Sequence, residues 1–568
     1  MRELFARLFS RPVLAAEMLA ATLLANILVL ASPIFVMQVL NRYVAHGVDA
    51  TLATLVAGVT LAIIMELSFR QIRMRLANCI NSNYDRAVAH GAFSTLTTTR
   101  SGAIEQLPTG LRQEMISGAE KLQAAYSATN MSTFLDVPFA IFFIGVLFLL
   151  NPTIAAVVTG FVAAGFIISM ISLGLLRRPI RDMQGAGGLR SGLIGSAIQA
   201  GDTVRAFNGG SFIRRHWQAQ TDNFHGLFRK ISSRQGFLQS LGMSLQALMG
   251  AAVISVGGLQ VVAGTMDVGA MIGANILAAR ALGPILKFAM MTEQIAKARQ
   301  ALKMFAEFSR LPRERAEGSA LSTYTGSITF EDMAFSYPGS KAPLFESVNL
   351  KLEAGSTLVF SGSNGSGKST MSRILAGLLE PTRGKILVDG VDLAQISPEW
   401  WRKQIMYMPQ EPKFLDASLA ENITLAAPDT TSKRLNELIN MAGLRAFVDQ
   451  SSDGTDTPII GGGKNLALGI RRRIAFARAL ATDGKVMIID EPTEGLDTQG
   501  CQCILESINA MTARGATVLI FTHDPNLLQK VPQYVDLNSK PVPALVRKPT
   551  PVPAANSDEA DPQRNTSP

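Results

Sequence analysis

The run 362–370, with the sequence GSNGSGKST, has the residue types and spacing of a loop that binds phosphate. A short β-prone run at 357–360 precedes it and a helical pattern follows at once. Its glycines therefore leave room for backbone N–H groups to turn toward an anion at the positive end of a helix. We predict that Lys368 binds the β- and γ-phosphates of a nucleotide and that the Ser369 hydroxyl is a ligand of Mg²⁺. The residues expected to contact the nucleotide here are Gly362, Ser363, Asn364, Gly365, Ser366, Gly367, Lys368, Ser369 and Thr370.

Two carboxylates end a second apolar run. Residues 486–489 are typical of a buried strand, and Asp490 and Glu491 follow them. Asp490 is suited to the Mg²⁺ shell, and Glu491, one residue beyond the strand, is suited to polarising the water that attacks the γ-phosphate. A strand that simply ends in acidic residues is the alternative, and the phosphate loop earlier in the chain favours the catalytic interpretation.

An amide, an imidazole and a phenol complete the predicted site. Gln410 follows the apolar run 405–409, and its amide oxygen can coordinate Mg²⁺ or hold a water near the γ-phosphate. His523 ends another apolar run and can hydrogen-bond the γ-phosphate, while Tyr337 can stack on adenine. The predicted catalytic residues are Glu491, His523 and Gln410, and the predicted Mg²⁺ ligands are Ser369, Gln410 and Asp490.

The elements that must position these residues have the pattern of an α/β domain. The stretch 326–350 alternates like antiparallel strands, and the short apolar runs that end in functional residues are separated by helical patterns. We therefore expect an α/β P-loop domain with an antiparallel subdomain.

Composition indicates that the part of the chain before residue 300 lies in a membrane, whereas the predicted α/β domain lies in water. Of the 568 residues, 48% are hydrophobic and only 17% are charged, and the apolar runs lie before residue 300. The net charge of +9 does not indicate nucleic-acid binding, because the arginines gather at the ends of apolar segments. Three cysteines provide neither a disulfide framework nor a zinc site.

Six apolar segments approach the ~20 residues needed to cross a membrane. The charged stretches 70–132 and 177–234 lie between them and belong in water, and their Lys and Arg residues place both termini on the cytoplasmic side. The expected spans are about 16–36, 51–65, 134–150, 154–176, 237–262 and 268–291.

Two basic residues lie within the sixth expected span. Arg280 and Lys287 are seven residues apart and hence nearly on one helical face, as expected for residues that line a pathway. The alternative for Lys287 is that its ammonium group extends to the cytoplasmic membrane surface.

The set of Tyr337, the phosphate loop, Gln410, the strand ending in Asp490 and Glu491, the turn 495–497 and His523 resembles the nucleotide-binding domain of ABC transporters. One membrane domain joined to one such domain resembles an exporter half-transporter that must dimerise. The expected domains are a membrane domain at 1–309, a linker at 310–325, an ATPase domain at 326–540 and a proline-rich disordered tail at 541–568.

Three membrane segments resemble those of the type I secretion permease/ATPases: 32–44, 134–152 and 279–285. No peptidase-like extension precedes the first span, as in the protease, lipase and S-layer exporters of that family. The resemblance implies a bacterial inner-membrane protein that uses ATP and Mg²⁺, exports an unfolded polypeptide, and works with a periplasmic adaptor (membrane fusion protein) and an outer-membrane channel. Two alternatives remain: export of lipid, drug or polysaccharide, or a regulatory membrane subunit that binds ATP.

The chain departs from the family at the signature, usually LSGGQ, where it has Leu466, Ala467, Leu468, Gly469 and Ile470. Ala467 removes a hydroxyl and Leu468 adds bulk where the γ-phosphate bound by a partner should dock. An acidic residue is also missing from the upstream run 459–463. A heterodimer whose partner supplies an intact signature explains these changes, and a homodimer in which Gly469 and the helix end suffice is the alternative.

Overall fold

The computed structural model describes residues 2–44, 47–107, 109–340 and 342–548. The chain divides into two units, one made of Met1–Thr99 and Ala103–Pro312 and the other of Arg100–Gly102 and Arg313–Pro568. Each unit has its own secondary structure and its own buried cores, so we describe them separately.

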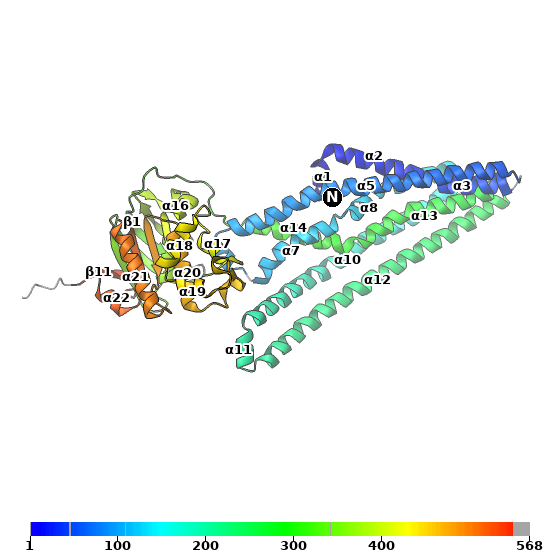
Figure 1. Cartoon of the computed structure of the whole chain (residues 1–568). Helices are drawn as coiled ribbons and strands as arrows, with labels where there is room; N and C mark the ends of the chain where they lie inside the picture. The colour runs from blue at the N-terminus through cyan, green and yellow to red at the C-terminus, as the bar shows by residue number, and fades with distance from the viewer. Residues whose placement is uncertain (1, 45–46, 108, 341, 549–568) are drawn as a thin grey trace, which may run out of the picture. The chain divides into compact units, whose positions relative to one another are not determined.

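The first unit is helical, and its described residues contain six segments long and apolar enough to cross a membrane (Figure 1). Five shorter helices flank or link the longer ones: α1 (Arg2–Phe9), α6 (Ser101–Glu105), α7 (Thr109–Ala125), α11 (Gly201–Ala206) and α14 (Thr292–Phe308). The membrane-length segments contain α2 (Pro12–Leu28), α3 (Ala31–Gln38) and η1 (Val39–Tyr43); α5 (Asp49–Thr98); α8 (Ala128–Asp136) and α9 (Phe139–Leu150); α10 (Pro152–Gln199); α12 (Gly210–Val262); and α13 (Val268–Met290).

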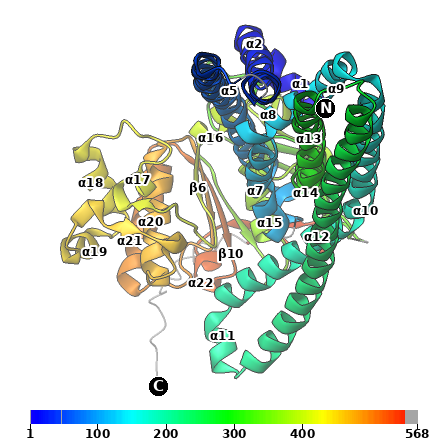
Figure 2. The same ribbon diagram turned by 90° about the vertical axis from the view of Figure 1, so that its right-hand side faces the viewer.

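Each expected span falls within one of these segments, but three helices extend far beyond it. α5, α10 and α12 have 50, 48 and 53 residues, and at 1.5 Å per residue each is more than twice as long as the ~30 Å hydrocarbon layer. The charged stretches predicted to lie in water are therefore partly continuations of the spans. α10 and α12 run side by side, as both views show (Figures 1 and 2).

The third span is interrupted where the sequence contains Pro138. α8 ends at Asp136 and α9 begins at Phe139, because proline cannot donate the backbone hydrogen bond that a continuous helix needs. Asp136 lies 2.6 Å from the Arg73 guanidinium and accepts a 3.1 Å hydrogen bond from Asn26. These polar contacts join α2, α5 and α8.

α13 is the most deeply packed of the six spans, with 44% of its most apolar window buried. Its buried face consists largely of small residues, which let neighbouring helices approach closely. Arg280 and Lys287 of the same helix are exposed.

The second unit contains a six-stranded sheet in the order β12-β11-β3-β10-β9-β6. Only β12 is antiparallel to its neighbour. The strands are β3 (Thr357–Ser361), β6 (Ile405–Met408), β9 (Val486–Asp490), β10 (Thr517–Thr522), β11 (Gln533–Asp536) and β12 (Ala544–Arg547).

An antiparallel sheet in the order β2-β1-β4-β5 contains the alternating stretch predicted near residues 326–350. Its strands are β1 (Ile328–Phe335), β2 (Phe345–Leu352), β4 (Arg383–Val388) and β5 (Val391–Asp392), and a small pair is made by β7 (Ala417–Ser418) and β8 (Pro458–Ile459). The helices of this unit are α15 (Lys368–Leu375), α16 (Pro398–Gln404), α17 (Leu419–Ile423), α18 (Ser432–Met441), α19 (Arg445–Gln450), α20 (Leu468–Ala481), α21 (Thr498–Ala513) and α22 (Pro525–Gln529).

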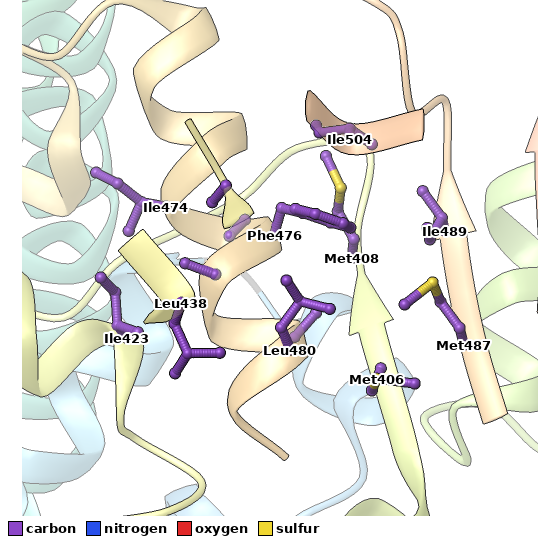
Figure 3. Close-up of a cluster of buried hydrophobic side chains, with 14 of the residues drawn as sticks. Met406, Met408, Ile423, Leu438, Ile474, Phe476, Leu480, Met487, Ile489 and Ile504 are labelled. Atoms are coloured by element: carbon purple, nitrogen blue, oxygen red, sulfur yellow. The ribbon is translucent and has the colours of Figure 1, made fainter. Parts of the chain in front are cut away.

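Apolar side chains hold α20 against the six-stranded sheet. Figure 3 shows Phe476 of α20 beside Met408 of β6, whereas Ile474 lies on the other side of the helix, toward Ile423 of α17; all of them are buried. α17, α18, α19 and α21 gather on the same side of β6 and β10 (Figure 2). Burial of this apolar surface fixes the beginning of α20 relative to the ends of the central strands.

The prediction of a disordered tail at 541–568 is wrong for residues 544–547. Residues 544–547 form β12 and pair with β11, so the fold continues beyond the predicted boundary at 540. The composition of the segment concealed this strand, because proline-rich sequence is still tolerated at the edge of a sheet. Residues 549–568 lie outside the described part of the chain.

Candidate functional site

The predicted site residues meet at the carboxyl ends of adjacent parallel strands. β3, β10, β9 and β6 are neighbours in that order, and Asp490 is paired with Phe521 in the ladder between β9 and β10. The loop after β3, the carboxylates after β9, His523 after β10 and Gln410 after β6 therefore come together. This edge is where open α/β sheets bind ligands.

The phosphate loop has the backbone that its glycines predict. Gly365 and Gly367 have φ values of +82° and +107°, in the left-handed region that favours glycine. A Cβ on Gly367 would lie 2.4 Å from the Phe345 ring, so a side chain is also excluded by packing. α15 begins directly after this residue, which directs its N-terminal N–H groups toward the loop.

Lys368 is buried at the centre of the loop. Its ammonium group donates hydrogen bonds to the backbone oxygens of Gly362 (2.7 Å) and Ser363 (3.3 Å), and it lies 3.4 Å from Oε1 of Glu491. The loop thus concentrates positive charge where nucleotide phosphates are expected to bind.

Glu491 is held in place by residues of the neighbouring strand. Its carboxylate accepts hydrogen bonds from the Thr522 hydroxyl (3.1 Å) and the His523 backbone N–H (3.3 Å), and its Oε1 lies 2.7 Å from Nδ1 of His523. Its φ of +52° is costly for a residue with a side chain, on the order of 1–3 kcal/mol. The sheet therefore maintains a strained backbone at the residue predicted to polarise water.

The predicted Mg²⁺ ligands also converge. The Ser369 hydroxyl donates a 3.0 Å hydrogen bond to Oε1 of Gln410. The Ser372 hydroxyl donates a 3.3 Å bond to Oδ2 of Asp490, and Oδ1 of Asp490 is buried without a hydrogen-bond partner. Burial raises the pKa of Asp490 to about 6, although the hydroxyl of Ser369 lowers it.

These residues fit Mg²⁺ chemically. A hydroxyl, an amide oxygen and a carboxylate are oxygen ligands, and the unpartnered oxygen of Asp490 is buried beside them. Among the residues that the structure describes, no group of three or more His, Cys, Asp and Glu could hold a metal. Mg²⁺ bound by these oxygens would take its remaining ligands from phosphate and water.

Tyr337 lies near the loop but is not buried in it. Its hydroxyl is 2.9 Å from Oγ1 of Thr370, its ring packs edge-on against Phe335, and the residue is 43% exposed. An exposed ring at this position is available for stacking, which stays a prediction.

The C-terminal segment contributes residues that we did not predict. Oδ1 of Asn538 accepts hydrogen bonds from the N–H (2.9 Å) and hydroxyl (2.8 Å) of Ser363. Lys540 donates to the backbone oxygens of Ser366 and Leu344, both at 2.6 Å. No local sequence signal could reveal these contacts, because Lys540 and Ser366 are 174 residues apart in the chain.

The altered signature lies at the start of α20. Ala467 occupies the N-cap position and makes no side-chain capping bond, whereas a serine could accept one. Leu468 is 42% exposed, and a Cβ on Gly495 would lie 2.7 Å from its Cδ2 atom. Leu468 therefore occupies space that is available only because residue 495 has no side chain.

Family comparisons agree with this architecture. Residues 16–285 match the ABC transporter transmembrane region, and residues 345–494 match the ABC transporter family. The chain therefore belongs to the ABC transporters and is an exporter with a multi-pass membrane region fused to an ATPase domain. Its ATPase activity is coupled to transport.

Individual relatives are similar at modest identity. The chain is 23% identical over 508 residues to the toxin RTX-I translocation ATP-binding protein of Actinobacillus pleuropneumoniae. It is 24% identical over 512 residues to the leukotoxin translocation ATP-binding protein LktB of Mannheimia haemolytica. Each match covers 89% of this chain and 72% of the relative.

A solved structure confirms the fold. A bacterial Atm1-family ABC exporter with ATP bound is 20% identical, with a TM-score of 0.78, and the match covers 92% of this chain and 93% of that one.

Proposed function

We propose that this protein is an ATP-driven subunit of a type I secretion system that moves an unfolded polypeptide across the bacterial inner membrane. The arrangement of Lys368, Glu491 and His523 supports the ATPase part of the proposal. The relatives named as toxin and leukotoxin translocation proteins support the choice of cargo.

In the proposed reaction, Lys368 and the loop N–H groups bind the β- and γ-phosphates of ATP. Glu491 accepts a hydrogen bond from the attacking water, and the bonds from Thr522 and His523 hold its carboxylate in the required orientation. His523 also donates to the γ-phosphate. Bound Mg²⁺ would be held by Ser369, Gln410 and Asp490, where it would neutralise charge on the phosphate oxygens.

We also propose that the protein functions as one half of a heterodimer. The chain retains Lys368 and Glu491, yet its signature lacks the capping hydroxyl and carries an exposed leucine. ATP on this chain would face the partner's intact signature and be hydrolysed. ATP on the partner would face Ala467 and Leu468 and would mainly remain bound.

The heterodimer is tested by purifying the chain alone and together with a second half-transporter encoded nearby. We expect little ATPase activity from the chain alone and robust activity from the pair. Strong activity from the lone chain, unchanged by combining Ala467→Ser with Leu468→Gly, would establish the homodimer instead.

The proposed topology places both termini and the ATPase domain in the cytoplasm. Its support is the excess of Lys and Arg in the stretches 70–132 and 177–234. The assembly would then pass its cargo to a periplasmic adaptor and an outer-membrane channel. Labelling of introduced cysteines in intact cells, with one in each short loop, checks this orientation.

Arg280 and Lys287 are proposed to line the export pathway. Both side chains are exposed and lie nearly on one face of α13, and Arg280 lies about 18 Å along the helix from Val268, near the middle of a span. A guanidinium group at this depth is costly against lipid, so this face is expected to border water.

A regulatory subunit that binds ATP without moving cargo is the second candidate, because the altered signature would favour binding over hydrolysis. Glu491→Gln distinguishes the two: abolished secretion supports the exporter, and unchanged secretion supports the regulatory subunit.

A further inference from the structure

We propose that Glu494 is a positioning residue that fixes the orientation of the Gln410 amide and connects this Mg²⁺ ligand to the signature helix through Arg472. Glu494 lies in the turn between β9 and α21 and is not among the residues predicted from the sequence. The inference deepens the proposed function, since it depends on Gln410 acting at the metal site.

The connection consists of hydrogen bonds to one carboxylate oxygen. Oε2 of Glu494 accepts a bond from Nε2 of Gln410 at 3.3 Å and a bond from the Arg472 guanidinium at 2.7 Å. The same guanidinium donates to the backbone oxygen of Gln410 at 3.1 Å and to the backbone oxygen of Glu491. Arg472 is the fifth residue of α20, so the signature helix contacts both the metal ligand and the catalytic residue.

Burial explains why Arg472 requires Glu494. The Arg472 side chain is only 2% exposed, whereas that of Glu494 is 43% exposed. A buried guanidinium group needs hydrogen-bond acceptors and a compensating charge, which the carboxylate and the two backbone oxygens supply. Arg472 thus holds Glu494 against the site although Glu494 could otherwise extend into solvent.

The carboxylate determines which end of the amide faces the metal position. An ionised carboxylate only accepts hydrogen bonds, so the NH₂ group of Gln410 must face Glu494. The amide oxygen then faces Ser369, as observed. If the amide were reversed, its oxygen would face the carboxylate oxygen of Glu494, and its NH₂ group would face the metal position.

The distance between the two expected ligands is suitable for one ion. Oγ of Ser369 and Oε1 of Gln410 are 3.0 Å apart. Adjacent ligands of an octahedral ion with bonds of 2.0–2.1 Å are separated by about 2.9 Å. Glu494 therefore maintains Gln410 in the geometry that Mg²⁺ requires.

The test measures metal affinity separately from nucleotide affinity in the purified, correctly paired transporter. Mn²⁺ serves as the probe and is followed by electron paramagnetic resonance with a saturating non-hydrolysable ATP analogue. Nucleotide affinity is measured in EDTA. We expect Glu494→Ala to weaken Mn²⁺ binding about tenfold, corresponding to the loss of one hydrogen bond to a charged group. Nucleotide affinity in EDTA should change less than about twofold.

Two variants distinguish positioning from general damage. Glu494→Gln retains an acceptor oxygen and should restore most of the Mn²⁺ affinity. Glu506→Ala removes an exposed carboxylate on α21 that bonds only to Gln502 among the contacts described, and should have no effect. In a Gln410→Ala background, Glu494→Ala should cause no further loss, because the ligand that it positions is absent.

Unchanged Mn²⁺ affinity in Glu494→Ala would overturn the proposal, as would an equal loss of nucleotide affinity in EDTA or additive losses in the double variant. A wild-type transporter that binds neither nucleotide nor Mn²⁺ would instead refute the proposed function. The two failures are therefore distinguishable.

Discussion

Replacing Lys540 with alanine should weaken nucleotide binding, although this residue lies far from the phosphate loop in sequence. The Lys540 ammonium donates hydrogen bonds to the backbone oxygens of Ser366 and Leu344, both at 2.6 Å, and lies 4.7 Å from the centre of the Phe345 ring. The bond to Ser366 directs a loop carbonyl toward the C-terminal segment, which helps the loop N–H groups to face the phosphates.

The expected loss is moderate because Lys540 is exposed. A hydrogen bond from a charged group contributes about 1.5–3 kcal/mol, and solvent screening of the exposed side chain reduces the two bonds together to about 1 kcal/mol. This corresponds to a roughly fivefold increase in Kd, since 1.4 kcal/mol is about a factor of ten.

The assay is titration of the full-length paired transporter with ATP in a Glu491→Gln background, which prevents turnover. Lys530→Ala is the matched control, because Lys530 is an exposed lysine immediately after α22. An unchanged Kd for Lys540→Ala, or an equal increase for Lys530→Ala, would refute the argument that Lys540 organises the loop.

Four further outcomes are expected. The Lys540 side chain is exposed overall, but partial desolvation of its ammonium group, whose bond to Ser366 is part-buried, lowers its pKa. The difference in Kd between the wild type and Lys540→Ala should therefore shrink as pH rises from 7 to 10 in the same titration, because the charge is lost. Lys368→Ala should weaken ATP binding at least about a hundredfold, since it removes a charge that contacts the phosphates; equal affinity would contradict the site. Ala467→Ser should add an N-cap bond worth about 1 kcal/mol and raise the thermal inactivation temperature, whereas Ala467→Val should not. Gly495→Ala should lower the thermal inactivation temperature, because the new Cβ would crowd Leu468 at a cost of about 1–3 kcal/mol and residue 495 has a φ of +71°. Leu468→Ala should partly reverse this loss, and additive effects of the two substitutions would count against the contact.

The nucleotide site could be predicted largely from local patterns. The loop around Lys368 and the strand before Glu491 have short-range signals, because glycine spacing and apolar runs dictate local backbone structure. Parallel strands then place their carboxyl ends at one edge, which accounts for the meeting of Gln410, Glu491 and His523. The alternating stretch near Tyr337 likewise forms the predicted antiparallel pair.

Other features could not be predicted in the same way. The lengths of α5, α10 and α12 depend on helices that continue through a change from apolar to charged sequence, where a hydropathy pattern marks only the apolar part. The proline content after residue 540 predicted disorder, but pairing of β12 with β11 outweighs that local tendency.

The amino-acid sequence by itself determined the phosphate loop, the buried strand that leads to Glu491 and the six apolar spans, because each depends on residues close together in the chain. Only the tertiary structure decided that Lys540 contacts the loop, that Leu468 packs over Gly495, and that Glu494 joins Gln410 to Arg472. These contacts join residues far apart in sequence, and their geometry exists only after burial of the apolar core has brought the strands and helices together.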